Sequence, residues 1–368
     1  MSRSRWVAAR SSPAAATCRE ERRGERAAMT DLLLDVRELS VSLAGRGAGA
    51  TLVDGVSFSV AAGEVVCIVG ESGCGKTVTA RSIIGLNRTD PNFELSGNVA
   101  FRGQNLLELD EESMRRLRGG SIAMIFQDPM SSLNPLQRIG AQIDEALSIH
   151  TQLDRTARRR RTLELLAEVG IPSPDTRIDD YPHQFSGGMR QRAMIALALA
   201  GNPALLIADE PTTALDVTMQ KQILLLIKRL RAEYAMAVIF ITHDLGVVAE
   251  IADRVLVMYA GRCVESGPVR DVLRAPQHPY TARLLASIPA ANRVKTRRLP
   301  TIKGATPMLA DGRPKGCAFR PRCDFAFEQC SDEPPLAPLE DGAHLSRCWL
   351  VPSVERSPAD LKIVEVLQ

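Results

Sequence analysis

A glycine-rich stretch near the start of the chain has the residue types needed to hold phosphate groups. It reads, in order, Gly70, Glu71, Ser72, Gly73, Cys74, Gly75, Lys76 and Thr77. The stretch fits the pattern G-x-x-x-x-G-K-[ST], in which glycines let successive backbone N–H groups turn toward phosphate oxygens. It follows an apolar run and precedes an expected helix, whose N-terminal dipole favours an anion. We expect Lys76 to reach the β- and γ-phosphates of a nucleotide and Thr77 to offer its hydroxyl to Mg²⁺.

A second apolar run, Leu205 to Ala208, ends in the acids Asp209 and Glu210. Asp209, at the strand end, is placed to hold Mg²⁺ directly or through water. Glu210 is placed to polarise an attacking water, and a positioned general base contributes about 10²- to 10⁴-fold to a rate. Alone, such a pair more often caps a turn, here before Pro211. Beside a phosphate-binding loop, we interpret it as the hydrolytic part of a nucleotide site.

A third segment narrows the choice among proteins that carry these two motifs. It reads Phe185, Ser186, Gly187, Gly188, Met189, Arg190, Gln191 and Arg192, shortly before Asp209. This segment resembles the signature sequence of ABC ATPases. Further elements agree in order and spacing with that family: Gln127, the stretch Ala214 to Asp216, and His243. The resemblance extends over residues 31 to 290.

The resemblance implies that two ATPase subunits meet head to tail with ATP between them. One subunit supplies residues 70–77, and the other supplies Ser186, Gly187 and Gly188, which suit a γ-phosphate. The remaining roles are also carried over: Gln127 touches Mg²⁺ or the water, His243 contacts the γ-phosphate and orients Glu210, and Asp216 bridges to the partner. The implied reaction is phosphoryl transfer to water, driven by positioning and electrostatics.

The same sequence resembles a narrower group, the importers of oligopeptides and dipeptides and their nickel-import relatives. The residues that carry this likeness are Gln127 to Pro135, Tyr181 to Gln184, Gln277 to Thr281 and the cysteine-containing tail. The group implies a second, different ATPase subunit as partner, two transmembrane permease subunits and an extracytoplasmic solute-binding protein. It places the chain peripherally on the cytoplasmic face of the cell membrane. The cargo stays open among dipeptides, oligopeptides, nickel, opines and other small solutes.

One residue departs from the family pattern. ABC ATPases often stack an aromatic side chain from the first strand pair on adenine, whereas Leu43 occupies that position here. Aromatic residues are only 4% of the chain, and no substitute is evident near Leu43 in the sequence. A strict preference for ATP over GTP is therefore not predicted.

Alternating strand and helix patterns predict an α/β fold with a P-loop core. We expect an antiparallel β subdomain from Leu32 to Val60 and a helical insert at about residues 90–200. The ATPase domain is expected at 29–268, and a small cysteine-containing domain at 269–368. Residues 1–28 are interpreted as a disordered extension, or as a stretch before the true start at Met29.

Bulk composition is that of an ordinary globular chain of 368 residues, with 45% hydrophobic and 24% charged residues. The formal net charge of +3 gives no reason to expect a nucleic-acid partner. No run of about 18 apolar residues predicts a membrane span, so we expect any membrane role to come through a partner. The basic run Arg158 to Arg161 is interpreted as a solvated helix face.

Four of the eight cysteines, Cys317, Cys323, Cys330 and Cys348, lie close together near the end of the chain. Without an export signal, such a group more often binds metal than forms disulfides. The spacing lacks the C-x2-C pairs of zinc ribbons, and nearby arginines, Arg320, Arg322 and Arg347, could offset the charge of a cluster. We favour a [4Fe–4S] cluster, with Zn²⁺ as the alternative and plain buried thiols as the third reading.

Two further functions compete with an importer motor. A soluble ABC ATPase acting on ribosomes or DNA usually carries two cassettes or a long coiled-coil insert, and this chain has one cassette and no heptads. An iron–sulfur regulatory module with a vestigial nucleotide site would not need the intact set Lys76, Asp209, Glu210 and His243. The importer motor therefore remains the favoured hypothesis.

Overall fold

The computed structural model describes most of the chain. The described ranges are 32–45, 50–128, 132–213, 215–287, 302–309, 312–339 and 342–350. The expected extension at 1–28, residues 129–131 of the Gln127 segment, and residue 214 lie outside these ranges.

Apolar runs form the centre of a large twisted sheet. Its parallel strands are β3 (Val65–Val69), β6 (Ile122–Ile125), β7 (Leu205–Asp209), β8 (Ala237–Thr242) and β9 (Arg254–Tyr259). Every residue of β3, β6, β7 and β8 is buried, which explains why these strands read as continuous hydrophobic runs rather than alternating ones. The apolar run expected at 205–208 is confirmed as β7, which extends one residue further, to Asp209.

A second sheet is antiparallel and has the strand order β2-β1-β4-β5. Its strands are β1 (Leu32–Leu43), β2 (Thr51–Ala61), β4 (Phe93–Phe101) and β5 (Gln104–Asn105). The expected pairing of the first two strands is confirmed. Residues 93–125 hold β4, β5, the helix α3 (Glu111–Leu117) and β6, so the expected helical insert is narrower than 90–200. The strand β4 pairs with β1 because its apolar residues complete the core under that sheet.

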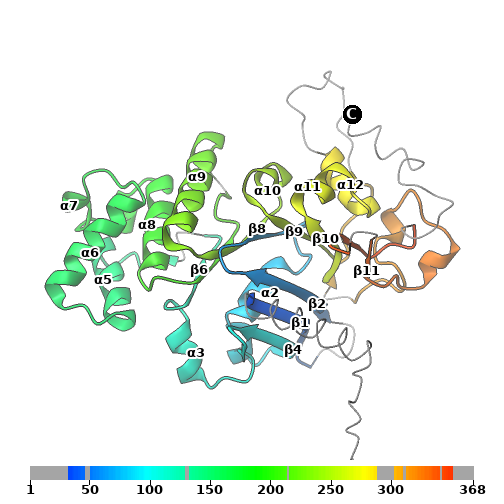
Figure 1. Cartoon of the computed structure of the whole chain (residues 1–368), viewed down its shortest axis with the longest axis horizontal. Coiled ribbons are helices and arrows are strands. Elements are labelled where there is room, and N and C mark those ends of the chain that lie inside the picture. Colours follow the sequence, from blue (N-terminus) through cyan, green and yellow to red (C-terminus); the bar gives the residue numbers. More distant parts are fainter. Residues whose placement is uncertain are drawn as a thin grey trace, which may run out of the picture.

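The helical part follows β6 and lies at one end of the molecule (Figure 1). It contains α5 (Ile139–His150), α6 (Arg155–Glu168), α7 (Pro174–Arg177), η2 (Pro182–Gln184) and α8 (Gly187–Leu199). Buried residues such as Leu147, Leu165 and Leu166 join these helices to the main core. Gly170 lies between α6 and α7, and Pro182 begins η2.

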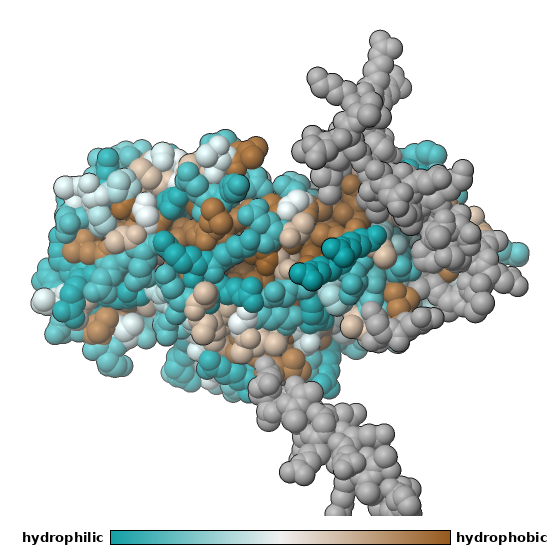
Figure 2. All heavy atoms as spheres, turned by 45° about the horizontal axis from the view of Figure 1, so that its top comes forward, coloured by the Kyte–Doolittle hydropathy of each residue, from teal (hydrophilic) through white to brown (hydrophobic). Residues whose placement is uncertain are grey.

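The remaining helices cover the sheets. They are α2 (Lys76–Ile83), η1 (Asn87–Thr89), α9 (Val217–Tyr234), α10 (Leu245–Ile251), α11 (Val269–Arg274), α12 (Pro279–Ala286), η4 (Arg320–Arg322) and η5 (Glu328–Ser331). Helices α9 to α12 lie on one side of the large sheet, and α2 with the antiparallel sheet lies on the other (Figure 1). Hydrophilic residues cover much of the surface in Figure 2, with hydrophobic patches between them. Among the described helices, none is both long enough and apolar enough to cross a bilayer.

The C-terminal region extends the large sheet. Strands β10 (Arg262–Pro268), β12 (Leu345–Ser346) and β11 (Ala337–Pro338) add to β9 in antiparallel fashion, giving the order β11-β12-β10-β9-β3-β8-β7-β6. Tyr280, Leu309 and Phe319 belong to the same core cluster as the central strands. The described residues after 268 are therefore packed against the preceding part of the chain through shared strands and shared apolar contacts.

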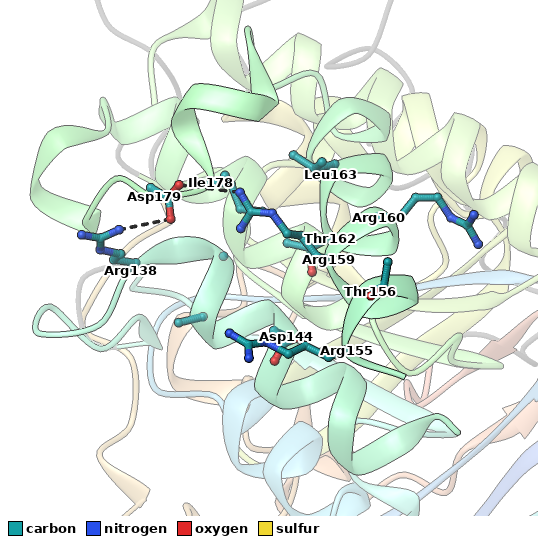
Figure 3. Close-up of a pocket in the computed structure, with 12 residues that line it drawn as sticks. Arg138, Asp144, Arg155, Thr156, Arg159, Arg160, Thr162, Leu163, Ile178 and Asp179 are labelled. Carbon is teal, nitrogen blue, oxygen red and sulfur yellow. Dashed lines mark hydrogen bonds and ion pairs between the residues drawn. The ribbon is translucent and has the colours of Figure 1, made fainter. Parts of the chain in front are cut away.

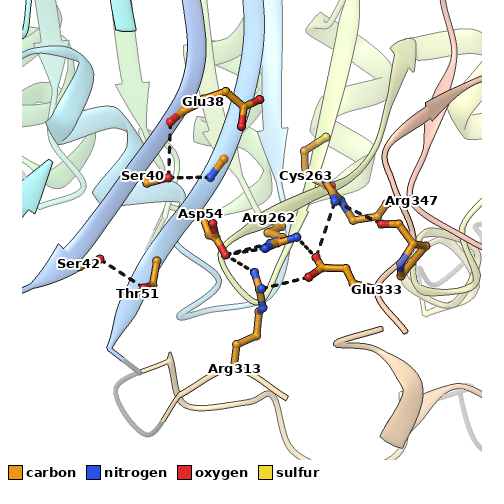
Figure 4. Close-up of polar contacts among 12 residues, drawn as sticks. Glu38, Ser40, Ser42, Thr51, Asp54, Arg262, Cys263, Arg313, Glu333 and Arg347 are labelled. Atoms are coloured by element: carbon orange, nitrogen blue, oxygen red, sulfur yellow. Dashed lines mark hydrogen bonds and ion pairs between the residues drawn. The ribbon is translucent and has the colours of Figure 1, made fainter. Parts of the chain in front are cut away.

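An ion-pair network also joins the C-terminal region to the antiparallel sheet (Figure 4). Asp54 of β2 accepts hydrogen bonds from Arg262, at 2.8 Å from Nη2, and from Arg313, at 2.5 Å from Nη1. Glu333 pairs with both arginines and, at 3.7 Å, with Arg347. The pKa of Asp54 is lowered, since the two guanidinium groups outweigh the effect of burial, which alone would raise it.

Glu265 of β10 is a fully buried carboxylate with three donors. It accepts hydrogen bonds from the backbone N–H groups of Gln277 at 2.6 Å and His278 at 3.0 Å, and it contacts His344 Nε2 at 2.7 Å. The Nδ1 atom of His278 in turn accepts from the N–H of Tyr280 and caps α12. This carboxylate therefore fixes the turn that leads into α12.

Replacing Glu265 by alanine leaves these buried donors without an acceptor. We expect Glu265→Ala to lower the free energy of unfolding by about 3 kcal/mol, in the range found when a buried charged pair is broken. Urea unfolding followed by circular dichroism measures this change. Glu233→Ala, on the exposed face of α9, serves as control and should stay within about 0.5 kcal/mol of the parent protein. Equal midpoints for the two variants would contradict the assigned role of Glu265.

Candidate functional site

The candidate site lies where the carboxyl ends of the parallel strands meet. The register pairs Val69 with Thr242 and Asp209 with Ile241, so β3, β7 and β8 end side by side. Loops that leave these ends carry residues 70–77, Glu210 and His243. In open parallel sheets, ligand sites form at this edge.

The glycine-rich loop is already curled around a central lysine. Gly75 has φ of 102° at the N-cap of α2, in the left-handed region that glycine tolerates. A Cβ atom on Gly70 would lie 2.2 Å from the carbonyl oxygen of Met258, so only glycine fits there. Lys76 is buried, and its Nζ donates to the carbonyl oxygens of Gly70 at 2.8 Å and Glu71 at 3.0 Å. The loop therefore has the shape of a phosphate cradle before any ligand arrives.

Thr77 and Asp209, far apart in sequence, meet across the sheet edge. Thr77 Oγ1 donates to Asp209 Oδ1 at 3.1 Å. Burial raises the pKa of Asp209, and the charge of Glu210 raises it further, while the Thr77 hydrogen bond acts in the opposite direction. A carboxylate that is buried next to another acid is stabilised in its charged form by a cation. The pair thus provides the hydroxyl and carboxylate oxygens that Mg²⁺ prefers.

One oxygen of Glu210 collects three polar side chains. Its Oε2 atom lies 3.2 Å from Gln127 Nε2, 2.9 Å from Thr213 Oγ1 and 3.3 Å from His243 Nδ1. The backbone of Glu210 has φ of 46°, and its N–H donates to the carbonyl oxygen of Ile241 at 3.0 Å. A left-handed non-glycine residue is uncommon and costs free energy. The structure therefore brings Gln127, Glu210 and His243 together, and Thr213, which the sequence analysis missed, joins them.

The signature residues lie apart from this group. Ser186 caps α8 by accepting a hydrogen bond from Met189 N, and Gly187 and Gly188 form the first turn. Asp216 caps α9 through Met219 N at 2.9 Å. No hydrogen bond among the described residues joins Ser186, Gly187, Gly188 or Asp216 to residues 70–77, and α8 and α2 lie in different parts of the molecule (Figure 1).

Glu71 faces the C-terminal region. Its backbone N–H donates to Tyr280 Oη at 2.8 Å, and its carboxylate accepts hydrogen bonds from Arg322 and Thr306. The pattern of residues 70–77 does not predict these partners, because each lies more than two hundred residues away along the chain. Tyr280 was visible only as part of the stretch Gln277 to Thr281.

The four C-terminal cysteines line one small pocket, together with His278 and Phe319. Burial, together with a smaller effect of the neighbouring thiols, raises the pKa of Cys323 to about 11 and that of Cys348 to about 12. Among the described residues, no three His, Cys, Asp or Glu side chains form a group that could hold a metal ion as they stand.

Two arginines near the cysteines, Arg322 and Arg347, make contacts that the sequence analysis did not predict. Arg322 pairs with Glu71, and Arg347 donates to the carbonyl oxygen of Cys263 at 2.9 Å and lies near Glu333. These two side chains are thus committed to carboxylates outside the pocket. That these arginines offset the charge of a cluster therefore stays a prediction.

Leu43, which stands where the family often has an aromatic residue, lies directly opposite Phe93 in the register of β1 and β4. An aromatic side chain is therefore present one strand away, which the sequence analysis missed. The cross-strand pairing could not be inferred from Leu43 alone, because it depends on which strand follows β1 in the sheet.

A hollow in the helical part is lined by several arginines (Figure 3). Asp179 lies between Arg138, at 3.2 Å, and Arg159, at 3.8 Å, while Arg158 pairs with Asp144 at 2.9 Å. Much of the basic run at 158–161 is therefore neutralised by acids of the same subdomain. This pairing agrees with a solvated helix face held by local ion pairs.

Comparisons with known proteins follow the same division of the chain. Residues 53–213 match the family described as ABC transporter, and residues 264–330 match the oligopeptide/dipeptide transporter C-terminal region. A probable peptide ABC transporter ATP-binding protein of Sinorhizobium fredii is 51% identical, over 87% of this chain and 95% of its own length. The oligopeptide transport ATP-binding protein OppD of Bacillus subtilis is 48% identical, over 87% of this chain and 89% of its own length.

Solved structures show the same fold. A dimeric ATP-binding cassette in a post-hydrolysis state, bound to ADP and Pi, superposes with a TM-score of 0.57 at 27% identity. The match covers 64% of this chain and 99% of the chain of that structure. A cassette from Clostridium perfringens, part of an ABC transporter complex, gives 0.56 at 27% identity, over 66% of this chain and 90% of its own. With the P-loop, Asp209, Glu210 and His243 gathered at one sheet edge, the chain belongs to the ATP-binding proteins of ABC transporters.

Proposed function

We propose that this chain binds and hydrolyses ATP and thereby powers the import of di- or oligopeptides through an ABC transporter. The observation that carries the hydrolytic part is the meeting of Gln127, Thr213 and His243 on one carboxylate oxygen of Glu210. The peptide cargo is supported by the relatives from Sinorhizobium fredii and Bacillus subtilis and by the match to the C-terminal region of peptide transporters.

In the proposed reaction, residues 70–77 hold the phosphates of ATP, and Lys76 leaves the carbonyl groups it now contacts to bind the β- and γ-phosphates. Glu210 accepts a hydrogen bond from the attacking water, and His243 and Gln127 fix the orientation of that carboxylate. Thr77, Asp209 and Gln127 are the proposed Mg²⁺ ligands. The bound Mg²⁺ supplies positive charge that stabilises the phosphate oxygens in the transition state.

The proposed assembly pairs this chain with a second ATPase subunit in a head-to-tail dimer. The separation of Ser186 to Gly188 from the P-loop supports this arrangement, because the signature residues of one chain can then face the γ-phosphate held by the other. Asp216 is proposed to bridge the two subunits. Two permease subunits, an extracytoplasmic solute-binding protein and a location at the cytoplasmic face of the membrane complete the proposal.

We also propose that residues 29–268 form the nucleotide-binding part and residues 269–368 a regulatory part with a [4Fe–4S] cluster, or Zn²⁺ as the alternative. Cys317, Cys323, Cys330 and Cys348 are the proposed ligands, because all four line one pocket. Burial raises the pKa of Cys317, Cys323 and Cys348, so metal must displace protons from these thiols on binding.

Replacing the proposed general base should separate binding from hydrolysis. We expect Glu210→Gln to lower the rate of phosphate release by about 10²- to 10⁴-fold and to leave the dissociation constant for MgATP within about threefold. Phosphate release and fluorescent-nucleotide titration measure the two quantities. Glu250→Gln, on α10, is the matched control and should hydrolyse ATP at the parent rate. Undiminished hydrolysis by Glu210→Gln would remove Glu210 from this role.

Metal analysis tests the proposed cluster. Protein purified without oxygen should contain about four irons and absorb visible light, and both properties should be lost in Cys323→Ser and Cys330→Ser. Cys263→Ser, outside the proposed ligand set, should keep them. Colourless protein with about one zinc would favour the structural alternative. Protein free of both metals would leave the pocket as a group of buried thiols and overturn the proposal.

A further inference from the structure

The second residue of the P-loop is held from outside the nucleotide-binding part. Arg322 donates to both carboxylate oxygens of Glu71, at 2.5 Å from Nη1 to Oε2 and 3.0 Å from Nη2 to Oε1. Thr306 Oγ1 donates to Oε2 at 2.8 Å, and Tyr280 Oη accepts from the Glu71 N–H at 2.8 Å. Both the side chain and the backbone of Glu71 are thus fixed by the C-terminal region.

Arg322 is itself rigidly placed. Its side chain is only 5% exposed, its Nε donates to the carbonyl oxygen of Lys303 at 2.8 Å, and its guanidinium lies 5.8 Å from the centre of the Tyr259 ring. A bidentate arginine–carboxylate pair is a strong and directional contact, and lysine cannot reproduce its geometry. Burial would raise the pKa of Glu71, but the hydrogen bonds from Arg322 and Thr306 lower it overall.

The position of Glu71 matters to the phosphate cradle. Its carbonyl oxygen is one of the two that accept from Lys76 Nζ, and its neighbour Gly70 is wedged against Met258. A phosphate cradle works through the directions of successive N–H groups, so a displaced backbone at Glu71 misdirects the loop that follows. The contacts that fix Glu71 therefore also fix the backbone of the nucleotide site.

The same segment forms the four-cysteine pocket. Arg322 directly precedes Cys323, and Phe319 lines the pocket with the cysteines. The Phe319 ring also packs against Tyr280, with centroids 5.4 Å apart, and against Tyr259, at 5.3 Å. Both contacts of Glu71, through Arg322 and through Tyr280, are thus one packed neighbour away from the thiols.

We propose that Arg322 is a positioning residue that holds the P-loop through Glu71, and that the state of the four-cysteine pocket controls nucleotide affinity through this contact. The inference rests on the proposed nucleotide site, but it concerns affinity and not the chemical step. A well-packed pocket keeps Arg322 and Tyr280 in place and the cradle ready for phosphates. A disturbed pocket releases Glu71 and weakens binding of MgATP.

A double-mutant cycle on the full chain tests the contact. We expect Glu71→Gln and Arg322→Gln each to raise the dissociation constant for a fluorescent ATP analogue about tenfold, within the range typical of coupled sites. The double variant should bind no more weakly than either single variant, because the two changes remove one interaction. In turnover by Arg322→Gln, KM should rise while kcat at saturation stays near the parent value. Arg322→Lys should fail to restore binding.

Arg116→Gln is the control, because it breaks the exposed ion pair of Arg116 with Glu112 on α3, apart from both the P-loop and the four-cysteine pocket. Its nucleotide affinity should equal that of the parent protein. Additive losses in the double variant, or an equal loss in Arg116→Gln, would overturn the positioning role. Circular dichroism identifies a variant that fails to fold, and Glu71→Gln, which leaves the buried arginine in place, then carries the test.

A second cycle tests the link to the pocket. Cys323→Ser should weaken nucleotide binding in the parent background and have no further effect in the Glu71→Gln background. Equal effects in both backgrounds, or none in either, would overturn the link. The readout is binding by the purified chain, so failure of this link is distinguishable from failure of the hydrolytic proposal, which the turnover of Glu210→Gln decides.

Discussion

The parallel register of β3, β7 and β8 is the constraint on which the nucleotide site depends. Each strand is fully buried, and backbone hydrogen bonds set each strand end beside the next. Thr77, Asp209 and His243 come from separate parts of the chain, and only this alignment brings them within reach of one another. A slip of one residue would exchange the side chains that face the two core clusters on either side of the sheet, so the packing of those particular side chains protects the geometry of the site.

The local parts of this arrangement could be predicted from the sequence because their signals are local. The pattern of residues 70–77 predicts a phosphate-binding loop, and the apolar run that ends in Asp209 predicts a buried strand with an acid at its end. The placing of His243 beside Glu210 followed from a resemblance, since nothing in their own surroundings in the sequence joins them. The same resemblance implied for Gln127 only a contact with Mg²⁺ or water, so its contact with Glu210 was not predicted. Thr213 was missed because a threonine in a turn after an acid commonly has a structural role.

The contacts of the C-terminal region could not be predicted, for a physical reason. Glu71 and Arg322 are joined by the fold over 251 positions in the chain. A single sequence gives no sign of such a pair, and a charged residue near cysteines suggests a nearer partner. The same holds for β11 and β12, whose two-residue strands carry too short a pattern to be recognised. A segment without a periodic hydrophobic pattern takes its position from the part of the fold that it packs against. Its position can therefore be predicted only once that part of the fold is known.

The two outer strands of the large sheet have a consequence for the protein in concentrated solution. Within the described residues, one edge is β11, which has only two residues and ends in Pro338, a residue without a backbone N–H. The other edge is β6, which is four residues long and has an additional backbone bridge between Arg118 and Ile122. Long, regular edges invite strand-to-strand aggregation, whereas short or interrupted edges discourage it. A hydrophobic eight-stranded sheet can therefore exist in this molecule without offering a template along which further copies would stack.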